Sequence, residues 1–340
     1  MSAPRVEDWG LTAQGERGLL FTLEGEGIRA RISNFGACVV SLEVADRTGE
    51  MADVVLGFDT LAEYESARNP YFGGIVGRVA NRLGGANFEL DGRRHVLDPN
   101  EGRHHLHGGS RGFDRYLWAA RAVRGKSGVN FRRRSPAGES GYPGNLDVRV
   151  TYVLGAERTL EIVYDAVSDA LTPINLTQHT YFNLAGSGTI LGHNLELRAN
   201  RYVVVDSELI PTGELRGVEN TEFDFRSERA IGRVQTSYDI CYELAGRYWN
   251  TRPVTACRLS DPGSGRVLEI EAMQPGLQLY TGQYLDGLQG KLGRLIPRFG
   301  GVCLEAQHFP DSVHHDNFPS TILKPGDHYL RVMRWRFSNT

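Results

Sequence analysis

The sequence alternates between apolar and polar residues along many short segments. Between Ile28 and Ser33, positions 28, 30 and 32 are apolar while 29, 31 and 33 are polar. Similar alternation runs from Leu146 to Leu154, from Thr159 to Ala166 and from Met333 to Ser338. A period of two puts one side of a strand in a core and the other in water, as in antiparallel sheets. The pattern therefore predicts a chain built mainly from antiparallel strands.

Turn residues separate pairs of these segments. Asp91-Gly92 lies between 87–90 and 93–96, which is the signature of a two-residue hairpin. Asp261-Pro262-Gly263 separates 256–259 from 266–270 in the same way. Glycine accounts for 41 of 340 residues, well above the usual ~7%, and such an excess indicates many turns. The expected fold is all-β, a large antiparallel β-sandwich with few short helices.

Helix signals are scarce, and charge and composition exclude several classes of protein. Asp59 is expected to cap one short helix through Leu61 and Tyr64. With 38 basic and 41 acidic residues, the chain lacks the basic field of a nucleic-acid binder. No run of about 18 apolar residues predicts a membrane span, and the N-terminus has no apolar signal region. No linker or repeat divides the chain, so a single domain over 1–340 is expected, with about the first 15 residues peripheral.

The cysteines and the arginine run have unremarkable expected roles. The cysteines (Cys38, Cys241, Cys257 and Cys303) are far apart and form no CxxC pair. We expect buried free thiols in a reducing compartment, and hence a cytoplasmic protein. The run Arg132-Arg133-Arg134 is followed by a Gly/Pro-rich stretch and is expected to form a solvated turn.

No Walker loop, GxGxxG, GxSxG or HExxH motif is present, so nucleotide, hydrolase-elbow and zincin chemistry lose their main support. Polar residues instead interrupt apolar or Gly-rich segments at 77–82, 104–109, 175–184 and 301–310. Burying such groups costs free energy unless each has a partner, so these segments are candidates for lining a pocket.

Each of these segments has a structural alternative. The arginines of 77–82 could form a salt-bridged turn, and His179 could be a core histidine. His105 and His107 are two apart, which permits metal ligation on a strand, but no carboxylate or cysteine nearby completes a ligand set. We therefore expect no metal and favour a hydrogen-bonding histidine beside a ligand. Glu305 could be a general base, because an apolar setting resists its ionisation, or half of a buried ion pair.

Taken together, these segments resemble the aldose 1-epimerases, the galactose mutarotases. The resemblance extends from about Asn34 to the C-terminus. Its strings, in order, are GRVANR, LHGG followed by GFD, SPAGESGYPGN, NLTQHTYFNLAG, VDSELIPTG, PGLQLYTGQYLDG and GVCLEAQHFPDSVHHDNFP. The family implies a galactose mutarotase-like antiparallel β-sandwich whose concave face binds a free sugar and interconverts its anomers without metal or organic cofactor.

The resemblance also implies residue roles. The family's glutamate corresponds to Glu305, the general base, and its histidine to His179, the general acid. We expect Glu305 to be ionised and His179 to be an imidazolium in the active form. The residues expected to bind the sugar are Asn81, Arg82, His107, Asp239, Gln278 and Tyr181.

Two departures from the family pattern bear on these roles. The family usually has an Asp-His-Asn string where this chain has Asp239-Ile240-Cys241. It also commonly has Asn at the positions of Gln178 and His105. Alternatives to a free-sugar epimerase are a hexose-6-phosphate 1-epimerase, a glycosidase with Asp239 as the second carboxylate, and a non-catalytic sugar-binding sandwich. The physiological aldose, and the choice between monomer and homodimer, stay open.

Overall fold

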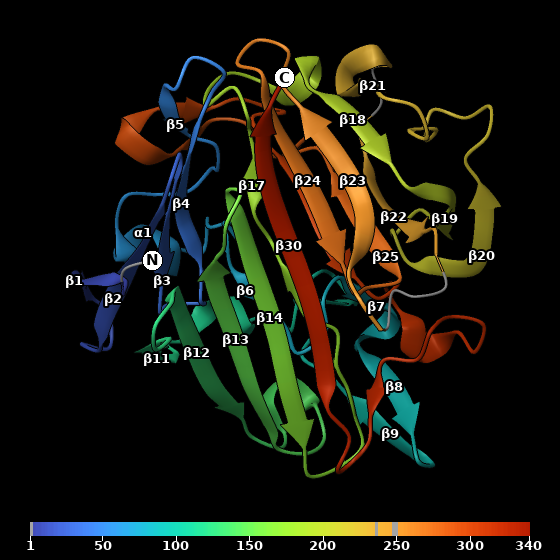
Figure 1. The fold of residues 1–340 in the computed structure, drawn as a ribbon. Helices are drawn as coiled ribbons and strands as arrows, with labels where there is room; N and C mark the ends of the chain where they lie inside the picture. The colour runs from blue at the N-terminus through green and yellow to red at the C-terminus, as the bar shows by residue number, and fades with distance from the viewer. Residues whose placement is uncertain (1–2, 235–236, 247–250) are drawn as a thin grey trace.

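Three antiparallel sheets form the body of the protein in this computed structural model, which describes residues 3–234, 237–246 and 251–340. The largest has nine strands and faces the viewer in Figure 1. Its strands, in spatial order, are β11 (Ala119–Ala122), β12 (Ser127–Ser135), β13 (Leu146–Leu154), β14 (Thr159–Ser168), β30 (Tyr329–Asn339), β24 (Arg266–Ala272), β23 (Val254–Ser260), β18 (Asn194–Leu197) and β21 (Arg229–Ala230).

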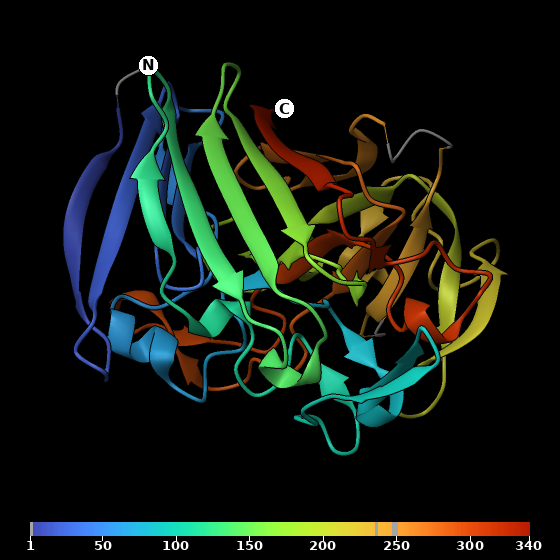
Figure 2. The ribbon, with the colours of Figure 1, turned by 90° about the horizontal axis from the view of Figure 1, so that it is seen from below.

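Two further sheets lie at opposite ends of the molecule. The six-stranded sheet consists of β17 (Tyr181–Phe182), β28 (Val302–Gln307), β25 (Gly276–Tyr280), β22 (Asp239–Leu244), β19 (Ala199–Val205) and β20 (Pro211–Gly217). The five-stranded sheet consists of β1 (Arg5–Leu11), β2 (Arg17–Gly25), β3 (Ile28–Ser33), β4 (Val39–Ala45) and β5 (Met51–Asp53). Figures 1 and 2 both show the five-stranded sheet beside β11 and β12, with β19 and β20 at the far end.

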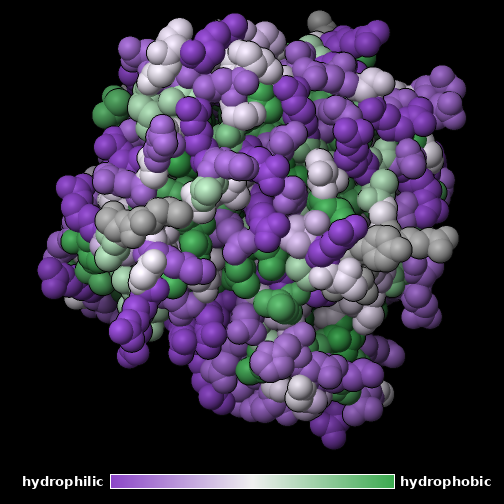
Figure 3. Space-filling view, viewed as in Figure 1, coloured by the Kyte–Doolittle hydropathy of each residue, from purple (hydrophilic) through white to green (hydrophobic). Residues whose placement is uncertain are grey.

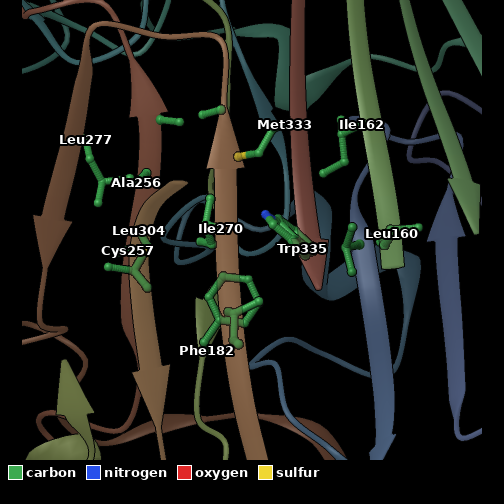
Figure 4. Packing of buried hydrophobic residues seen from close by; sticks show 14 of the residues in the cluster. Leu160, Ile162, Phe182, Ala256, Cys257, Ile270, Leu277, Leu304, Met333 and Trp335 are labelled. Carbon is green, nitrogen blue, oxygen red and sulfur yellow. The ribbon is translucent and has the colours of Figure 1, made fainter. Parts of the chain in front are cut away.

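The main core lies between the nine-stranded sheet and the other two sheets, to which alternate residues of all three contribute. Trp335 of β30 meets Phe182 of β17 edge-on, with ring centroids 4.9 Å apart (Figure 4). Leu277 and Leu304 of the six-stranded sheet belong to the same buried cluster as Ile270 of β24. Because one face of the six-stranded sheet is used for this core, its other face is available for polar residues.

Short ladders and turns connect these sheets. The two-stranded ladders are β6 (Ile75–Val76) with β16 (Thr177–Gln178), β7 (Arg82–Leu83) with β10 (His105–Leu106), β8 (Asn87–Leu90) with β9 (Arg93–Val96), β15 (Thr172–Pro173) with β29 (Ile322–Leu323), and β26 (Leu288–Gln289) with β27 (Leu295–Ile296). Within the described ranges the single α-helix is α1 (Leu61–Glu65). Turns of 3₁₀ helix lie at 84–86, 113–115, 139–141, 190–192, 231–233, 291–293 and 312–314.

The structure confirms the expected all-β architecture. The segment 28–33 is β3, and the longer alternating segments are β13, β14 and β30. Both predicted hairpins are present, as β8–β9 around Asp91-Gly92 and as β23–β24 around Asp261-Pro262-Gly263. Alternation was a sound guide here because each of these strands buries one side.

Two local predictions were wrong. Thr60, not Asp59, caps α1: its hydroxyl accepts from the Glu63 N–H, while the Glu63 carboxylate accepts from the Thr60 N–H at 2.9 Å. This capping box satisfies two helix-end donors at once, which Asp59 cannot do from one position earlier. The run 132–134 lies in β12 rather than in a turn. The Arg133 side chain is only 6% exposed there, because its guanidinium pairs with Glu139 at 2.8 Å and covers the Tyr116 ring.

The outer face of the large sheet carries charged side chains in cross-strand pairs. Arg334 of β30 contacts Glu161 of β14 at 2.8 Å and Glu271 of β24 at 3.5 Å. Figure 3 shows a mostly hydrophilic surface on this side, with small hydrophobic patches between the polar groups. No helix in the described ranges is long and apolar enough to cross a membrane.

Candidate active site

The site begins on the face of the six-stranded sheet that points away from the main core. Along β28, Val302, Leu304 and Ala306 enter the core cluster, so Glu305 projects from the opposite face. Its cross-strand neighbour on β25 is Gln278. The Gln278 amide in turn donates to Asp239 Oδ1 of β22 at 2.6 Å. Three adjacent strands thus hold three polar side chains close together, with Asp239 diagonal to Gln278 rather than directly opposite it.

Two histidines reach these side chains from the short ladders. His179 lies between β16 and β17, and its Nε2 is 3.8 Å from Glu305 Oε1. His107 follows β10, and its ring centroid is 5.2 Å from that of His179. The Asn81 backbone N–H donates to His107 Nδ1 at 3.1 Å. A neutral His107 therefore carries its proton on Nε2 and presents a donor on that side of the ring.

Aromatic rings and a thiol hold His179 in place. The rings of Tyr71 and Tyr181 lie nearly parallel to the imidazole, at centroid distances of 5.6 and 5.1 Å. Cys303 Sγ lies 3.5 Å from His179 Nδ1. Since Nδ1 faces the thiol and Nε2 faces Glu305, the imidazole is directed at the carboxylate.

Arg82 is the cation of the site, and two carboxylates neutralise it. Glu101 accepts two bonds from the guanidinium, at 2.6 and 2.9 Å. Asp239 Oδ2 lies 3.7 Å from Arg82 Nη1. The Arg82 side chain is 11% exposed, so the group is largely sheltered from solvent. This arrangement fixes the guanidinium and leaves no spare positive charge on Arg82.

Several buried polar atoms in the site have no hydrogen-bond partner within the described chain. They are Glu305 Oε2, Gln278 Oε1, and both side-chain amide atoms of Gln307 on the same face of β28. Buried polar atoms are normally satisfied, and an exposed hydroxyl of a ligand can satisfy them. A cluster of such atoms around Glu305 therefore indicates a site for a polar ligand.

Burial disfavours charge on both members of the His179–Glu305 pair. It raises the pKa of Glu305 well above its ordinary value, an effect that Asp239 strengthens and Arg82 opposes. Burial also lowers the pKa of His179 to about 4. Both shifts favour the uncharged forms of the two groups. The ionised Glu305 and protonated His179 expected in the active form therefore have to form against this desolvation cost.

The same residues raise the question of a metal. His107, His179 and Glu305 each offer one ligand atom within 4.8 Å of the others, and all three are buried. A ligating histidine normally donates its other ring N–H to an acceptor. At His107 the other nitrogen accepts from the Asn81 N–H instead, so Nε2 holds a proton and not a free lone pair. The three side chains therefore present a hydrogen-bond donor, His107 Nε2–H, which fits an acceptor oxygen of a ligand better than it fits a cation.

The structure brings most of the predicted site residues together. Glu305, His179, His107 and Arg82 form one cluster with Asp239 and Gln278, and Asn81 adjoins it through its backbone. Tyr181 lies behind His179, and its hydroxyl donates to the Pro70 carbonyl at 3.1 Å.

Other highlighted residues act elsewhere. The Arg78 guanidinium donates to Ser135, Thr172 and nearby carbonyls, so it braces loops rather than the site. His105 bonds the Asp98 carbonyl and the Tyr142 hydroxyl, and so it does not share a ligand set with His107. The Gln178 amide donates to the Gly73 carbonyl.

Sequence reasoning missed Tyr71 and Glu101. Tyr71 precedes Gly73-Gly74, and Glu101 lies four positions before His105. An aromatic residue or a carboxylate next to a glycine-rich segment is a weak signal, because such combinations are common in turns. Their importance follows from the rings and the guanidinium that they contact.

A buried carboxyl and imidazole close together among polar side chains have the chemistry of a proton-transfer site for a polar ligand. The family model described as aldose 1-epimerase matches residues 20–336. Galactose mutarotase from Sus scrofa is 44% identical over 324 residues, covering 94% of this chain and 93% of the relative. Aldose 1-epimerase from Haemophilus influenzae is 36% identical over 334 residues, with coverages of 94% and 95%.

A solved structure agrees with these relatives. The aldose epimerase homologue from C. elegans superposes with a TM-score of 0.89 at 32% identity, covering 94% of this chain and 99% of the other. The chain belongs to the aldose 1-epimerase family. It is accordingly an isomerase that interconverts the α and β anomers of aldoses.

Proposed function

We propose that this isomerase acts on free aldohexoses, galactose and glucose among them, with Glu305 as the base and His179 as the acid. The observation that carries the proposal is the separation of 3.8 Å between His179 Nε2 and Glu305 Oε1 in a buried setting. Two proton-transfer groups this close can act on neighbouring oxygens of one sugar. The galactose mutarotases among the relatives support galactose as a substrate.

Ring opening of the sugar requires a proton to leave O1 and another to reach the ring oxygen O5. Ionised Glu305 takes the O1 proton while the His179 imidazolium delivers its proton to O5. The product is the open aldehyde beside a protonated Glu305 and a neutral His179. Rotation about C1–C2 then presents the other face of the aldehyde, and the two transfers run backwards. Each positioned group typically contributes about 10²–10⁴-fold to the rate.

Burial fits this cycle because the pair holds one proton in both of its states. The ion pair matches the closed sugar, and the neutral pair matches the open aldehyde. Desolvation favours the neutral pair, as the pKa shifts of Glu305 and His179 indicate. Arg82 opposes the rise in the pKa of Glu305 and so helps the anion to form. The buried environment thus stabilises the neutral pair, which accompanies the open aldehyde, the least stable form of the sugar.

The remaining polar groups hold the sugar hydroxyls. His107 donates from Nε2 to an oxygen near the ring, and Asn81 lies beside it. Gln278 offers its unpartnered Oε1 to a hydroxyl, while Arg82 and Asp239 form a charged patch for others. Tyr181 has a different role: its hydroxyl is bonded to Pro70, and its ring supports His179.

Charge favours a free sugar over a sugar phosphate. Glu101 and Asp239 neutralise Arg82, so a phosphate at this patch would meet net negative charge.

On the strand of Asp239, the substituted position that faces the site is Cys241, since Ile240 belongs to the core cluster. A thiol there bonds hydroxyls more weakly than the amide common in the family. Preference among aldoses is expected to depend on this position.

Polarimetry of freshly dissolved α-anomers tests the proposal. The panel is galactose, glucose, xylose, arabinose and glucose 6-phosphate, with the spontaneous rate subtracted. Faster anomerisation of the free hexoses than of the phosphate is expected. A preference for the phosphate would contradict the free-sugar assignment, and release of product from an aryl glycoside would favour a glycosidase instead.

A cytoplasmic location is also proposed, and it is supported by four buried, unpaired cysteines.

A further inference from the structure

Tyr71 separates the catalytic imidazole from an open cleft. Its ring lies nearly parallel to that of His179, at an interplanar angle of 24°, and meets the His107 ring at a centroid distance of 4.7 Å. Tyr71 also lines a cleft with a volume of about 540 Å³, together with Asn100 and Asp114. One face of this ring therefore contacts the two imidazoles, and the residue also borders the cleft.

The two tyrosines beside His179 have different surroundings. Tyr181 is 2% exposed and packs in an apolar cluster with Phe72 and Leu285. Tyr71 is only partly buried, because its position faces the cleft. Tyr181 is therefore an inner wall that the fold needs for its own packing, whereas Tyr71 is an outer wall between the acid and solvent.

The segment that carries Tyr71 is bonded directly to the backbone of His179. The Gly73 N–H donates to the His179 carbonyl, and the His179 N–H donates to the Gly74 carbonyl, both at 2.9 Å. Gly73 has a φ of +61°, and a Cβ there would lie 2.1 Å from the Val39 carbonyl oxygen. Only glycine fits this approach. The wall and the acid are consequently held as one unit.

The backbone of Tyr71 supports a specific purpose for its position. Its φ is +64°, in the left-handed region that a bulky residue rarely adopts. Such a conformation persists where the surroundings hold it, and these residues concentrate at active sites. The Tyr181 hydroxyl helps to hold it by donating to the carbonyl of the preceding residue, Pro70.

We propose that Tyr71 is a positioning residue for anomerisation, whose ring keeps His179 directed at Glu305 and excludes water from the imidazole. The inference rests on the proposed role of His179 as the acid. Burial is the cause of the lowered pKa of His179. Removing the cover is therefore expected to raise that pKa toward its ordinary value of about 6.5.

The variants Tyr71→Ala and Tyr71→Phe distinguish the contribution of the aromatic ring from that of the hydroxyl group. Both variants are assayed for kcat and KM with galactose across pH, and the His179 ring is titrated by NMR. Tyr71→Ala is expected to lower kcat by about 10- to 100-fold, with a smaller change in KM, because a misdirected acid costs rate. The pH below which its kcat falls, and the pH at which the His179 ring titrates, should both move to higher values. Tyr71→Phe keeps the parental values, since it retains the ring.

Phe223→Ala is the matched control for the loss of a partly buried ring. Phe223 packs on Tyr202 at a centroid distance of 4.7 Å, away from His179. This variant is expected to unfold at a lower temperature with an unchanged acid limb. Should Tyr71→Ala fail to fold, Tyr71→Leu carries the same test, because it keeps apolar packing but covers less of the imidazole.

Two results would overturn the inference. An unmoved His179 titration in Tyr71→Ala would show that the ring does not control hydration of the imidazole. A loss in Tyr71→Phe as large as in Tyr71→Ala would show that the hydroxyl acts on the sugar. His179→Asn distinguishes these failures from failure of the proposed function. If that variant keeps the parental rate, the acid assignment is wrong whatever Tyr71 does; if it loses activity, only the Tyr71 inference is at stake.

Discussion

The two faces of the six-stranded sheet are both buried at β28, but one belongs to the core and the other to the candidate active site. Leu304 and Glu305 are consecutive residues of β28, and each is 2% exposed. Leu304 packs in the main core, where its neighbours are apolar. Glu305 faces His179 and keeps one carboxylate oxygen without a partner. Burial alone therefore does not distinguish core from site; the distinction lies in whether each buried group is satisfied.

The largest expected effect is the loss of kcat in Glu305→Gln, on the face of the six-stranded sheet that carries the candidate active site (the polar face). The amide keeps the size of the side chain but cannot accept the O1 proton, so kcat should fall by at least about 10²-fold while sugar binding is largely kept. The free energy of unfolding should not fall, because no packing is lost. Polarimetry and thermal unfolding measure the two quantities. Parental turnover in this variant would remove the base assignment.

Leu304→Ala makes the opposite change one residue away. Removing the buried side chain leaves a cavity and should lower the free energy of unfolding by about 2–5 kcal/mol. The kcat of the folded fraction should stay near the parental value, because Leu304 does not face the sugar. Denaturant unfolding and polarimetry at low temperature provide the measurements. A fall in kcat comparable to that of Glu305→Gln would mean that the two faces are mechanically coupled.

Glu101→Gln sharpens the comparison at the rim of the polar face. Glu101 holds Arg82 through two bonds, and its side chain is 38% exposed. We expect KM to rise about tenfold, as for the loss of one hydrogen bond to a charged group, with little change in kcat. Glu214→Gln is the control, since it breaks a surface pair with Arg216 and should change neither value. An unchanged KM in Glu101→Gln would mean that Arg82 needs no support.

The pH profile provides the finest test of the comparison. The active pair holds one proton, and acidification adds a second one at His179, whose pKa is lowered, so the loss of kcat/KM on acidification should occur below pH 6.5. Raising the pH removes the single proton from Glu305, whose pKa is raised, so the alkaline loss should occur well above pH 4.5. Leu304→Ala should leave both limbs in place, because the core face contains none of these groups. A His179 ring that titrates near its ordinary value of about 6.5 by NMR would contradict the desolvation of the pair.

Local patterns predicted the regular strands well. In β3 and β13, alternation follows from burial of one side, and the Asp91-Gly92 turn specifies its own hairpin. The errors came where tertiary contacts decide. Arg133 lies in a strand because Glu139 and Tyr116 bury its guanidinium, and neither is adjacent in sequence. The helix cap shifted by one residue to Thr60 because Glu63 returns a bond to it.

The sequence by itself determined the alternation, the turns and the presence of Glu305 and His179 within recognisable strings. These are local properties, since side-chain direction on a strand depends on residue parity. Tertiary structure decided which buried polar groups meet, that Tyr71 and Glu101 contact them, and that burial raises the pKa of Glu305 and lowers that of His179. Desolvation and distance depend on segments that are more than one hundred residues apart, such as 179 and 305, and only folding brings these together.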